Sequence, residues 1–310
     1  MPSATETPAA GQPLPVYFIG HAGANLLFRE DPNGVIVRRN LRAIGREIQA
    51  IRPAPRAILT LSGHFEASEI HGPGVIEVNV KPVTPILHDF VNDFHDTRPE
   101  LYLADWPHRD APELGTAVWK YLRAGTPTTP SIPAKRVERG VDHGLWVPFK
   151  VMFPDNAEEG PLEIPIVQVS TFHGYDLASQ VRLGEALQAL RSQGFLIIGS
   201  GMAVHSFASL AEIAAETTDE GRAAAKTKVL QESRTLDDHI RAATTLYGAK
   251  ERSKALLALE PLYEFKRSHP TVEHFTPLLV AAGAAGDSNV EALGEDVIDP
   301  GFSYINFRFQ

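Results

Sequence analysis

The sequence contains no cysteine, no long apolar run and no excess of basic residues. The absence of cysteine from all 310 residues excludes disulfides and thiolate zinc sites. It also fits a reducing compartment, so we expect a cytoplasmic protein. No apolar run approaches the roughly 20 residues that span a bilayer, and the N-terminus lacks the basic and apolar regions of a secretory signal. The formal net charge of -9 argues against nucleic acid as a partner.

Strand-like and helix-like segments alternate along the chain. Short apolar runs predict buried strands at residues 16–19, 57–62, 164–169 and 195–198. Helical spacing predicts helices at 35–50 and 176–192, the second capped by Asp176 and ended by Gly194. The alternation favours one α/β sandwich over residues 15–310, after a disordered Pro/Ala/Thr-rich tail at residues 1–14. The alternating last ten residues, GFSYINFRFQ, predict a further strand, which we expect at an edge.

Three histidines, His21, His64 and His205, each follow a strand-like run and small residues. Because neighbouring parallel strands end at one edge of an open sheet, we expect these imidazoles to gather there. A single histidine of this kind is more often a hydrogen-bonded structural residue, but three in the same position favour a site. The Gly199-Ser200-Gly201 turn also allows a phosphate loop, although neither GxGxxG nor GxxxxGK[ST] is present.

Two further segments bring histidine next to a carboxylate. Glu273 and His274 precede an apolar helix-like run, and only one of them is expected to face the site, because adjacent helical residues point in different directions. Asp142 and His143 precede LWVPFKVMFP, where a polar turn and a functional pair are equally good interpretations. We expect surface roles for the histidines in loops or on polar faces, which are His71, His88, His95, His108, His173 and His239.

Neutral imidazoles with at most one carboxylate suit Fe(II), Zn(II) or a similar first-row ion. A metal with open coordination positions would form a catalytic centre rather than a structural one. The sequence contains neither the GxSxG nucleophile elbow of serine hydrolases nor the HExxH motif of metalloproteases. Metal-dependent chemistry on a small substrate is therefore the leading hypothesis.

The order of the motifs resembles the extradiol aromatic ring-opening dioxygenases of the DOPA 4,5-dioxygenase type. These belong to the class III extradiol superfamily, with the protocatechuate 4,5-dioxygenase catalytic subunit. The similarity covers about residues 15 to 285, and its most specific motifs are DHGLWVPFKVMFP and HPTVEHFTPLL. The resemblance implies a single α/β domain, with a mixed, mostly parallel central sheet covered by helices on both faces. It also implies a mononuclear metal, Fe(II) for catalysis and often Zn(II) as isolated.

The resemblance also implies roles for individual residues. His21, His64 and His274 match metal ligands, while His205 matches either a further ligand or the acid/base beside the metal. His143 matches a histidine that faces the substrate. The first motif usually reads HGSP and here reads HAGA, and the second usually reads SAHW and here reads SGHF. Neither change removes a ligand, but both alter the wall around it.

The predicted reaction is ring cleavage of a catechol-type substrate with O₂ to a ring-opened semialdehyde. His205 would move protons, because the unperturbed pKa of histidine, near 6.5, lies close to working pH, and His143 would hydrogen-bond the substrate. The alternatives are a zinc-dependent hydrolase, in which the same histidines activate water, and a catalytically silent zinc-binding member of the family. The expected partners are a small aromatic substrate and O₂, with neither nucleic acid nor membrane, and the sequence leaves the substrate and the oligomeric state open.

Overall fold

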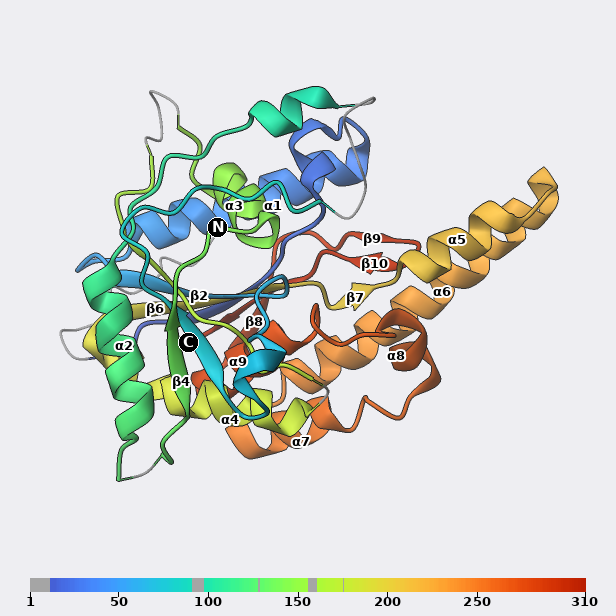
Figure 1. The fold of residues 1–310 in the computed structure, drawn as a ribbon. Coiled ribbons are helices and arrows are strands. Elements are labelled where there is room, and N and C mark those ends of the chain that lie inside the picture. Colours follow the sequence, from blue (N-terminus) through green and yellow to red (C-terminus); the bar gives the residue numbers. More distant parts are fainter. Residues whose placement is uncertain (1–11, 91–97, 128, 156–160, 175) are drawn as a thin grey trace.

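A six-stranded sheet forms the centre of the computed structural model, which describes residues 12–90, 98–127, 129–155, 161–174 and 176–310 (Figure 1). The strand order across the sheet is β5-β2-β6-β1-β11-β8. In chain order these strands are β1 (Val16–Gly20), β2 (Ala57–Ser62), β5 (Ile166–Gln168), β6 (Phe195–Gly201), β8 (Val290–Leu293) and β11 (Asn306–Phe309).

Strands β5, β2, β6 and β1 are parallel, whereas β11 runs antiparallel to both β1 and β8. This confirms the predicted mixed, mostly parallel sheet. The prediction of one edge strand at the end of the chain was wrong. That stretch divides into β10 (Phe302–Ser303), which belongs to a small sheet with β7 (Val204–His205) and β9 (Ile298–Asp299), and β11, which lies inside the main sheet. The apolar residues at 307 and 309 are fully buried, as an inner strand requires.

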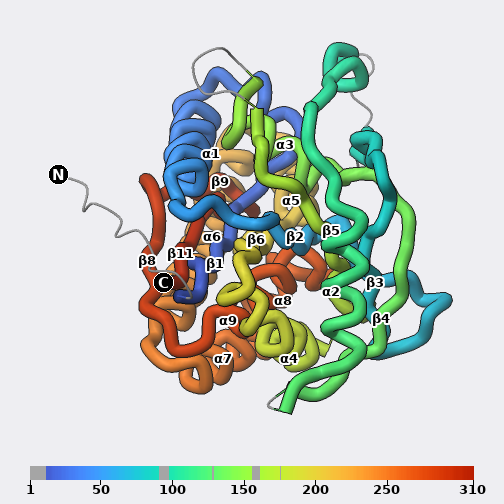
Figure 2. The backbone as a smooth tube through the Cα atoms, turned by 90° about the vertical axis from the view of Figure 1, so that its left-hand side faces the viewer, coloured from blue at the N-terminus to red at the C-terminus, as the bar shows by residue number. Residues whose placement is uncertain are grey.

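Helices cover both faces of the sheet, as Figures 1 and 2 show. On one face α1 (Pro32–Ala50) packs against α3 (His143–Met152), and on the other α4 (Leu177–Leu187) packs against α9 (Thr276–Ala285). Each face has its own apolar core, because side chains of one strand alternate between the two layers. Phe18 and Leu59, for example, belong to the α4–α9 side, whereas Tyr17 and Ile58 belong to the α1–α3 side.

The helix ends follow from local sequence chemistry. The Asp31 carboxylate accepts a hydrogen bond from the Gly34 amide at 3.1 Å at the start of α1, with Pro32 in the first turn. Asp176 accepts from the Ser179 amide at 3.1 Å at the start of α4, which confirms the predicted cap. Gly194, at φ 87°, ends the short 3₁₀ helix that follows α4, because glycine enters the left-handed region without a steric penalty.

The remaining elements extend from this sandwich. Helix α2 (Pro112–Ala124) covers the pair β3 (Ile76–Asn79) and β4 (Ala134–Val137). Helices α5 (Phe207–Ala215) and α6 (Asp219–Thr244) form an arm that projects from the body (Figure 1), and α7 (Ala249–Leu257) and α8 (Tyr263–Ser268) return the chain to α9. Within the described residues, no helix is long and apolar enough to cross a membrane.

Two local expectations need adjustment. The segment after Asp142, for which a polar turn is one of the two interpretations, forms α3 despite Pro148, and nearly all of its side chains are buried. Residues 1–11 of the predicted tail lie outside the described residues. Leu14, at the predicted end of that tail, is buried, and its carbonyl accepts from Arg191 Nε at 2.6 Å. The ordered structure therefore includes the last residue of the predicted tail.

Candidate functional site

Three of the predicted histidines meet at the carboxyl edge of the parallel strands. His21 directly follows β1, His64 lies two residues beyond β2, and His274 lies two residues before α9. Their ligand-type atoms all lie within 4.8 Å of one another. The Nε2 atoms of His64 and His274 are 3.2 Å apart. Tetrahedral zinc at about 2.0–2.1 Å from each nitrogen would separate two ligand atoms by roughly 3.3 Å, so the spacing suits a first-row metal ion.

Burial keeps these imidazoles neutral. His21 and His274 are almost completely buried, and burial, with the neighbouring histidines adding to it, holds the pKa of each well below the usual 6.5. Burial also lowers the pKa of His64 to about 3. A neutral imidazole has a free lone pair on one ring nitrogen, which is the form that binds a metal. The site is therefore in its ligand form at neutral pH.

The second ring nitrogen of two of these histidines faces an oxygen. His274 Nδ1 lies 2.9 Å from Glu273 Oε1. His274 therefore belongs to the three-histidine group, whereas the Glu273 carboxylate orients its ring. His21 Nδ1 lies 3.4 Å from Ser200 Oγ, and that hydroxyl donates to the Gly144 carbonyl at 2.5 Å. These contacts fix the ring orientations and leave the remaining nitrogens to converge.

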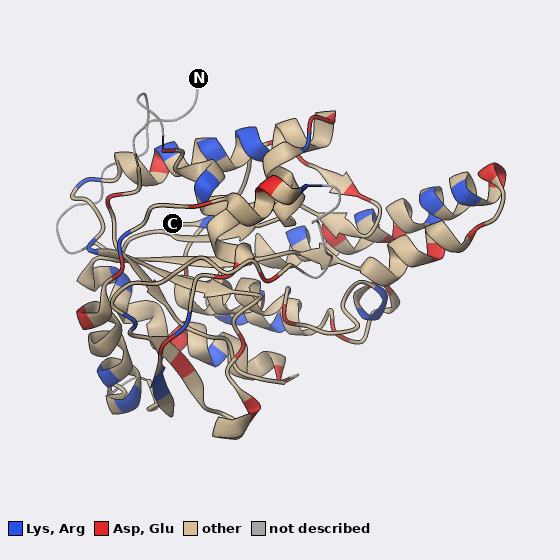
Figure 3. Cartoon of the chain, turned by 45° about the horizontal axis from the view of Figure 1, so that its top comes forward, with Lys and Arg blue, Asp and Glu red and all other residues tan. Residues whose placement is uncertain are grey.

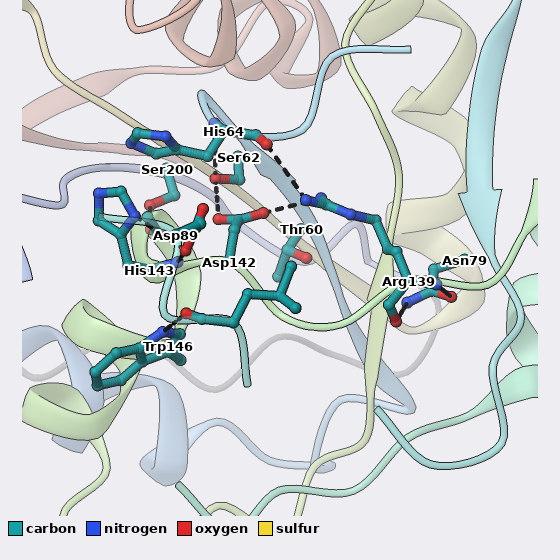
Figure 4. Close-up of polar contacts among 12 residues, drawn as sticks. Thr60, Ser62, His64, Asn79, Asp89, Arg139, Asp142, His143, Trp146 and Ser200 are labelled. Carbon is teal, nitrogen blue, oxygen red and sulfur yellow. Dashed lines mark hydrogen bonds and ion pairs between the residues drawn. The ribbon is translucent and has the colours of Figure 1, made fainter. Parts of the chain in front are cut away.

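His143 lies beside the same group, and its carboxylate partner is Asp89 (Figure 4). The His143 and His64 rings are 4.0 Å apart between centroids. Asp89 Oδ1 accepts from the His143 backbone amide at 3.0 Å and lies 3.2 Å from its Nδ1. Although burial raises the pKa of Asp89, contact with His143 lowers it overall. His64, Asp89 and His143 form a second, more exposed group with metal-ligand spacing.

Asp142, the sequence neighbour of His143, has a different function. Its fully buried carboxylate accepts from Ser62 Oγ at 2.6 Å and from Arg139 at 2.9 Å. Ser62 Oγ accepts from the His64 backbone amide at 3.1 Å, and Arg139 donates to the His64 carbonyl at 3.4 Å (Figure 4). Burial raises the pKa of Asp142, and Arg139 opposes that shift. This network therefore holds the backbone amide and carbonyl of His64 in place.

His205 stacks on His274 rather than pointing into the three-histidine group. The two rings are parallel within 8°, with centroids 3.6 Å apart. Among the described residues, both groups with metal-ligand spacing exclude His205. Burial lowers the pKa of His205 to about 4, so it is also neutral at neutral pH. The geometry therefore places His205 beside the three-histidine group and not within it.

Glycine allows these elements to approach so closely. A Cβ on Gly144, in the first turn of α3, would lie 2.6 Å from His64 Cδ2 and 2.7 Å from Ser62 Oγ. A Cβ on Gly63 would lie 3.1 Å from the Glu273 carbonyl oxygen and 3.2 Å from His274 Cα. A larger residue at either position would push apart segments that carry the histidines.

A cavity of about 280 Å³ opens onto the histidines. Its wall combines all five predicted histidines with small residues after β1 and with apolar side chains. The lining residues are His21, Ala22, Gly23, Ala24, Asn25, His64, Phe90, His143, Met202, His205, Phe207, Leu210, His274, Phe302 and Tyr304. The volume suits a single aromatic ring with its substituents.

The five histidines predicted for the site thus line one cavity. None of the described histidines for which surface roles were predicted is among the lining residues. His108 does not take its predicted surface role. Its side chain is only 7% exposed, stacks on Trp106 and contacts Thr84. His95 lies outside the described residues. Asp89 and the aromatic wall could not be predicted, because no strand end or motif in the sequence marks them.

Ala22 is the one described residue other than glycine with positive φ, at 59°. It occupies the position at which the resembling family usually has glycine, directly after His21. An L-residue pays a steric penalty in this left-handed region. Glycine would therefore adopt the backbone conformation of residue 22 at a lower steric cost than alanine does.

Comparison with known proteins identifies the family of this chain. Residues 17–310 match the family described as the catalytic LigB subunit of aromatic ring-opening dioxygenase. The chain belongs to this family. A 4,5-DOPA dioxygenase extradiol-like protein of Schizosaccharomyces pombe is 28% identical over 292 residues, which cover 89% of this chain and 87% of that protein. The 4,5-DOPA dioxygenase extradiol of Beta vulgaris is 30% identical over 256 residues, which cover 82% and 83%.

A solved structure agrees with this fold. The crystal structure of an uncharacterized protein from Escherichia coli K12 matches with a TM-score of 0.67 and 21% identity, covering 96% of this chain and all of that one. Membership of the LigB family supports a ring-cleaving dioxygenase, an oxidoreductase that acts on a small aromatic substrate with O₂.

Proposed function

We propose that this protein is a non-haem, metal-dependent extradiol dioxygenase that cleaves a catechol to a ring-opened semialdehyde. The observation that carries the proposal is the group of three neutral histidines, His21, His64 and His274, which faces an aromatic-sized cavity in a member of this family. In the overall reaction both atoms of O₂ enter the product, and a ring carbon–carbon bond next to the diol breaks.

His21, His64 and His274 would hold the metal. Their nitrogen spacing and neutral state fit Fe(II) or Zn(II), and Fe(II) is the catalytic form in this proposal. When bound, Fe(II) would bring the catechol and O₂ together and supply the redox chemistry. Three protein ligands leave positions open for substrate, as a catalytic centre requires.

The remaining histidines would handle protons and orientation. His205 lines the cavity, is neutral, and stacks on a ligand rather than joining the ligands, which supports a general acid–base role. Its ring can accept a proton from a catechol hydroxyl and return it later in the cycle. His143 also lines the cavity, and Asp89 beside its Nδ1 would orient the ring so that Nε2 meets the substrate.

The direct test loads the metal-free protein with Fe(II) under anaerobic conditions, adds one catechol at a time and then admits O₂. We expect O₂ uptake, together with a yellow product absorbing in the visible range, for at least one catechol. The zinc-loaded protein is the matched control and should consume none. Stoichiometric iron without uptake on any catechol would contradict the proposal and favour a zinc hydrolase or a silent zinc-binding protein.

A His205→Ala variant separates the acid–base role from a ligand role. We expect metal content to stay at the wild-type level and turnover to fall by roughly 10²–10⁴-fold, the usual contribution of general acid–base catalysis. His239→Ala, which removes an exposed histidine from α6, is the matched control. Loss of metal from the His205 variant alone would make His205 a ligand.

A further inference from the structure

The wall of the cavity differs from what a carboxylated catechol requires. Building on the proposed function, we propose that the preferred substrate is a catechol whose ring carries an uncharged, apolar substituent. The relatives named above have DOPA in their names, and DOPA carries a carboxylate and an amine. The proposal therefore separates this chain from the substrate in their names.

No lysine or arginine lines the cavity, although every lysine and arginine of the chain lies within the described residues. A substrate carboxylate is normally held by arginine or lysine, often in a bidentate pair. One candidate is Arg29, which donates to the hydroxyl of the cavity residue Tyr304 at 3.0 Å. That guanidinium is already held by Asp31 at 2.7 Å and Asp299 at 3.0 Å.

Among the described residues, two carboxylates whose ion-pair partners are histidines lie next to the cavity. Glu273 contacts His274, and Asp89 contacts His143, with each carboxylate within 3.2 Å of a histidine that lines the wall. The third nearby carboxylate, Asp142, is neutralised by Arg139. A substrate carboxylate placed here would be desolvated next to like charge, which is unfavourable.

The outer wall offers apolar surface instead. Phe207 and Leu210, on the first turns of α5, are 45% and 39% exposed although both line the cavity. Phe302 packs on Phe207 with ring centroids 5.6 Å apart, and both rings lie edge-on to His205. A substituent leaving the catechol in this direction would cover apolar side chains that now face solvent.

Figure 3 shows the same division along the projecting arm. The charged positions of the arm gather on α6 and at its tip, whereas α5 is drawn almost entirely as uncharged residues. The α5 sequence FASLAEIAA contains one charged residue, Glu212, and its carboxylate is held by Lys228 at 2.9 Å and by Arg267. The face that meets the cavity is therefore apolar and carries no free charge from α5.

A basic hollow on the far side of the 3₁₀ helix η1 (Ala24–Phe28) is the competing anchor for an anionic substituent. Asn25 is the one described residue that lines both spaces. Most of the cations there already have partners. Arg38 donates to the Leu26 carbonyl at 2.8 Å, and Lys150 donates to the Asp105 carbonyl at 2.6 Å. A substituent that reached this hollow would pass Asn25, and tighter binding of an anionic catechol than of an uncharged one would be the expected result.

The test measures binding separately from turnover. Zinc-loaded protein is titrated calorimetrically with 4-methylcatechol, 4-propylcatechol and 3-(3,4-dihydroxyphenyl)propanoate, the last two being similar in length and different in charge. Each buried methylene is worth about 4-fold in affinity, so 4-propylcatechol, with two more methylenes, should bind about 15-fold more tightly than 4-methylcatechol. It should also bind at least 10-fold more tightly than the propanoate. Equal or tighter binding of the propanoate would overturn the inference.

Iron-loaded protein then distinguishes the two proposals. O₂ uptake that favours the propanoate over 4-propylcatechol would leave the dioxygenase in place and overturn the apolar preference alone. Failure of every catechol to bind the zinc form and to support O₂ uptake by the iron form would overturn the proposed function, and this inference with it.

A pair of leucine variants localises the effect. Leu210→Arg places a cation on the outer wall, and Leu246→Arg makes the same change at a 43% exposed leucine outside the cavity lining. We expect Leu210→Arg to reduce the preference for 4-propylcatechol over the propanoate by at least 10-fold, whereas Leu246→Arg should leave the ratio unchanged. An unchanged ratio in both variants would remove Leu210 from the substrate wall and contradict the proposed route of the substituent.

Discussion

The two ends of helix α9 are both buried and both surrounded by residues that can carry positive charge, but their chemistry differs. At the C-terminal end, Arg191 donates to the carbonyls of Ala284 and Ala285 at 3.2 and 2.6 Å. Arg252, which is fully buried, donates to the carbonyl of Gly286 at 2.9 Å and to three further backbone carbonyls. Cations suit this end because the helix dipole places partial negative charge there.

At the N-terminal end the nitrogen-bearing residues are neutral histidines, and their lone pairs converge on one another. Burial alone therefore does not show which residues have a function. Where every donor meets a carbonyl, the group is a structural element. Where several lone pairs meet at metal-ligand distances, the group is suited to bind a cation. The predictions below test that distinction.

The largest expected effect is on stability at the arginine end. Arg252→Met should lower the free energy of unfolding by about 3–5 kcal/mol, because buried carbonyls lose their donors. Metal affinity of the folded fraction should be unchanged. Urea unfolding of the metal-free protein measures the first quantity, and Arg234→Met, at an exposed position on α6, is the control. A loss no larger than that of the control would mean that water replaces the guanidinium.

His274→Ala should produce the opposite pattern at the histidine end. Zinc affinity should fall by roughly 10²-fold or more, since structural zinc sites derive about 10–16 kcal/mol from their ligands together. The metal-free protein should lose less stability than Arg252→Met does. Competition with a chromophoric chelator measures the affinity. Wild-type zinc affinity in this variant would show that zinc binds to the second group, which contains Asp89 and His143.

A fall in pH should also affect the two ends of α9 differently. The folded-state pKa values of His64 and His205, about 3 and about 4, lie below the unfolded value near 6.5. The unfolded chain therefore binds more protons within that window, so stability rises with pH across it and is lost as pH falls below 6.5. We expect metal-free protein to lose a few kcal/mol between pH 7 and 4.5, at about 1.4 kcal/mol for each unit of pKa difference. The arginines stay charged in both states and add nothing.

Urea titrations at several pH values check this expectation, with zinc-saturated protein as the comparison. Bound metal competes with protons for the same nitrogens, so its presence should move the loss of stability to lower pH. A metal-free protein whose stability stays flat between pH 6.5 and 4.5 would mean that the histidines are protonated in the folded state.

The smallest expected effect concerns the strained residue beside His21. Ala22→Gly should raise the free energy of unfolding by about 0.5–1 kcal/mol, because glycine adopts positive φ without the penalty that alanine pays, less its larger chain entropy. Ala24→Gly, two residues further on in the 3₁₀ helix, should destabilise, since alanine fits that backbone. Destabilisation by both changes would show that contacts of the Ala22 methyl group outweigh the backbone strain.

The histidines could be predicted from the sequence because each signal was local. His21 and His64 follow apolar runs, and parallel strands bring such ends together whatever lies between them. Helix caps such as Asp176 were equally readable, since the cap and its partner amide lie three residues apart. Local chemistry therefore gave both the sheet and the core of the site.

Other parts depend on contacts between distant residues, for which one sequence has no signal. Asp89 meets His143 from a segment without regular structure, and Asp142 turns away from its own neighbour to bind Ser62. The interior place of β11 was hidden because alternation does not distinguish an edge strand from an inner one once both faces are partly covered. The apolar wall joins Phe207 and Phe302, which no sequence spacing connects.

The position of β11 has a consequence for the order of events during synthesis. β1 lies between β6 and β11, and the Gly20 amide donates to the Asn306 side chain, 286 residues further along the chain. His21 follows directly, so the backbone that carries this first histidine gains its second neighbour only when β11 has been made. Long-range pairings of this kind form slowly. A nascent chain would therefore carry His21 and His64 for most of its synthesis without the fold that brings them to His274, and the three-histidine group would be complete only after the last inner strand has entered the sheet.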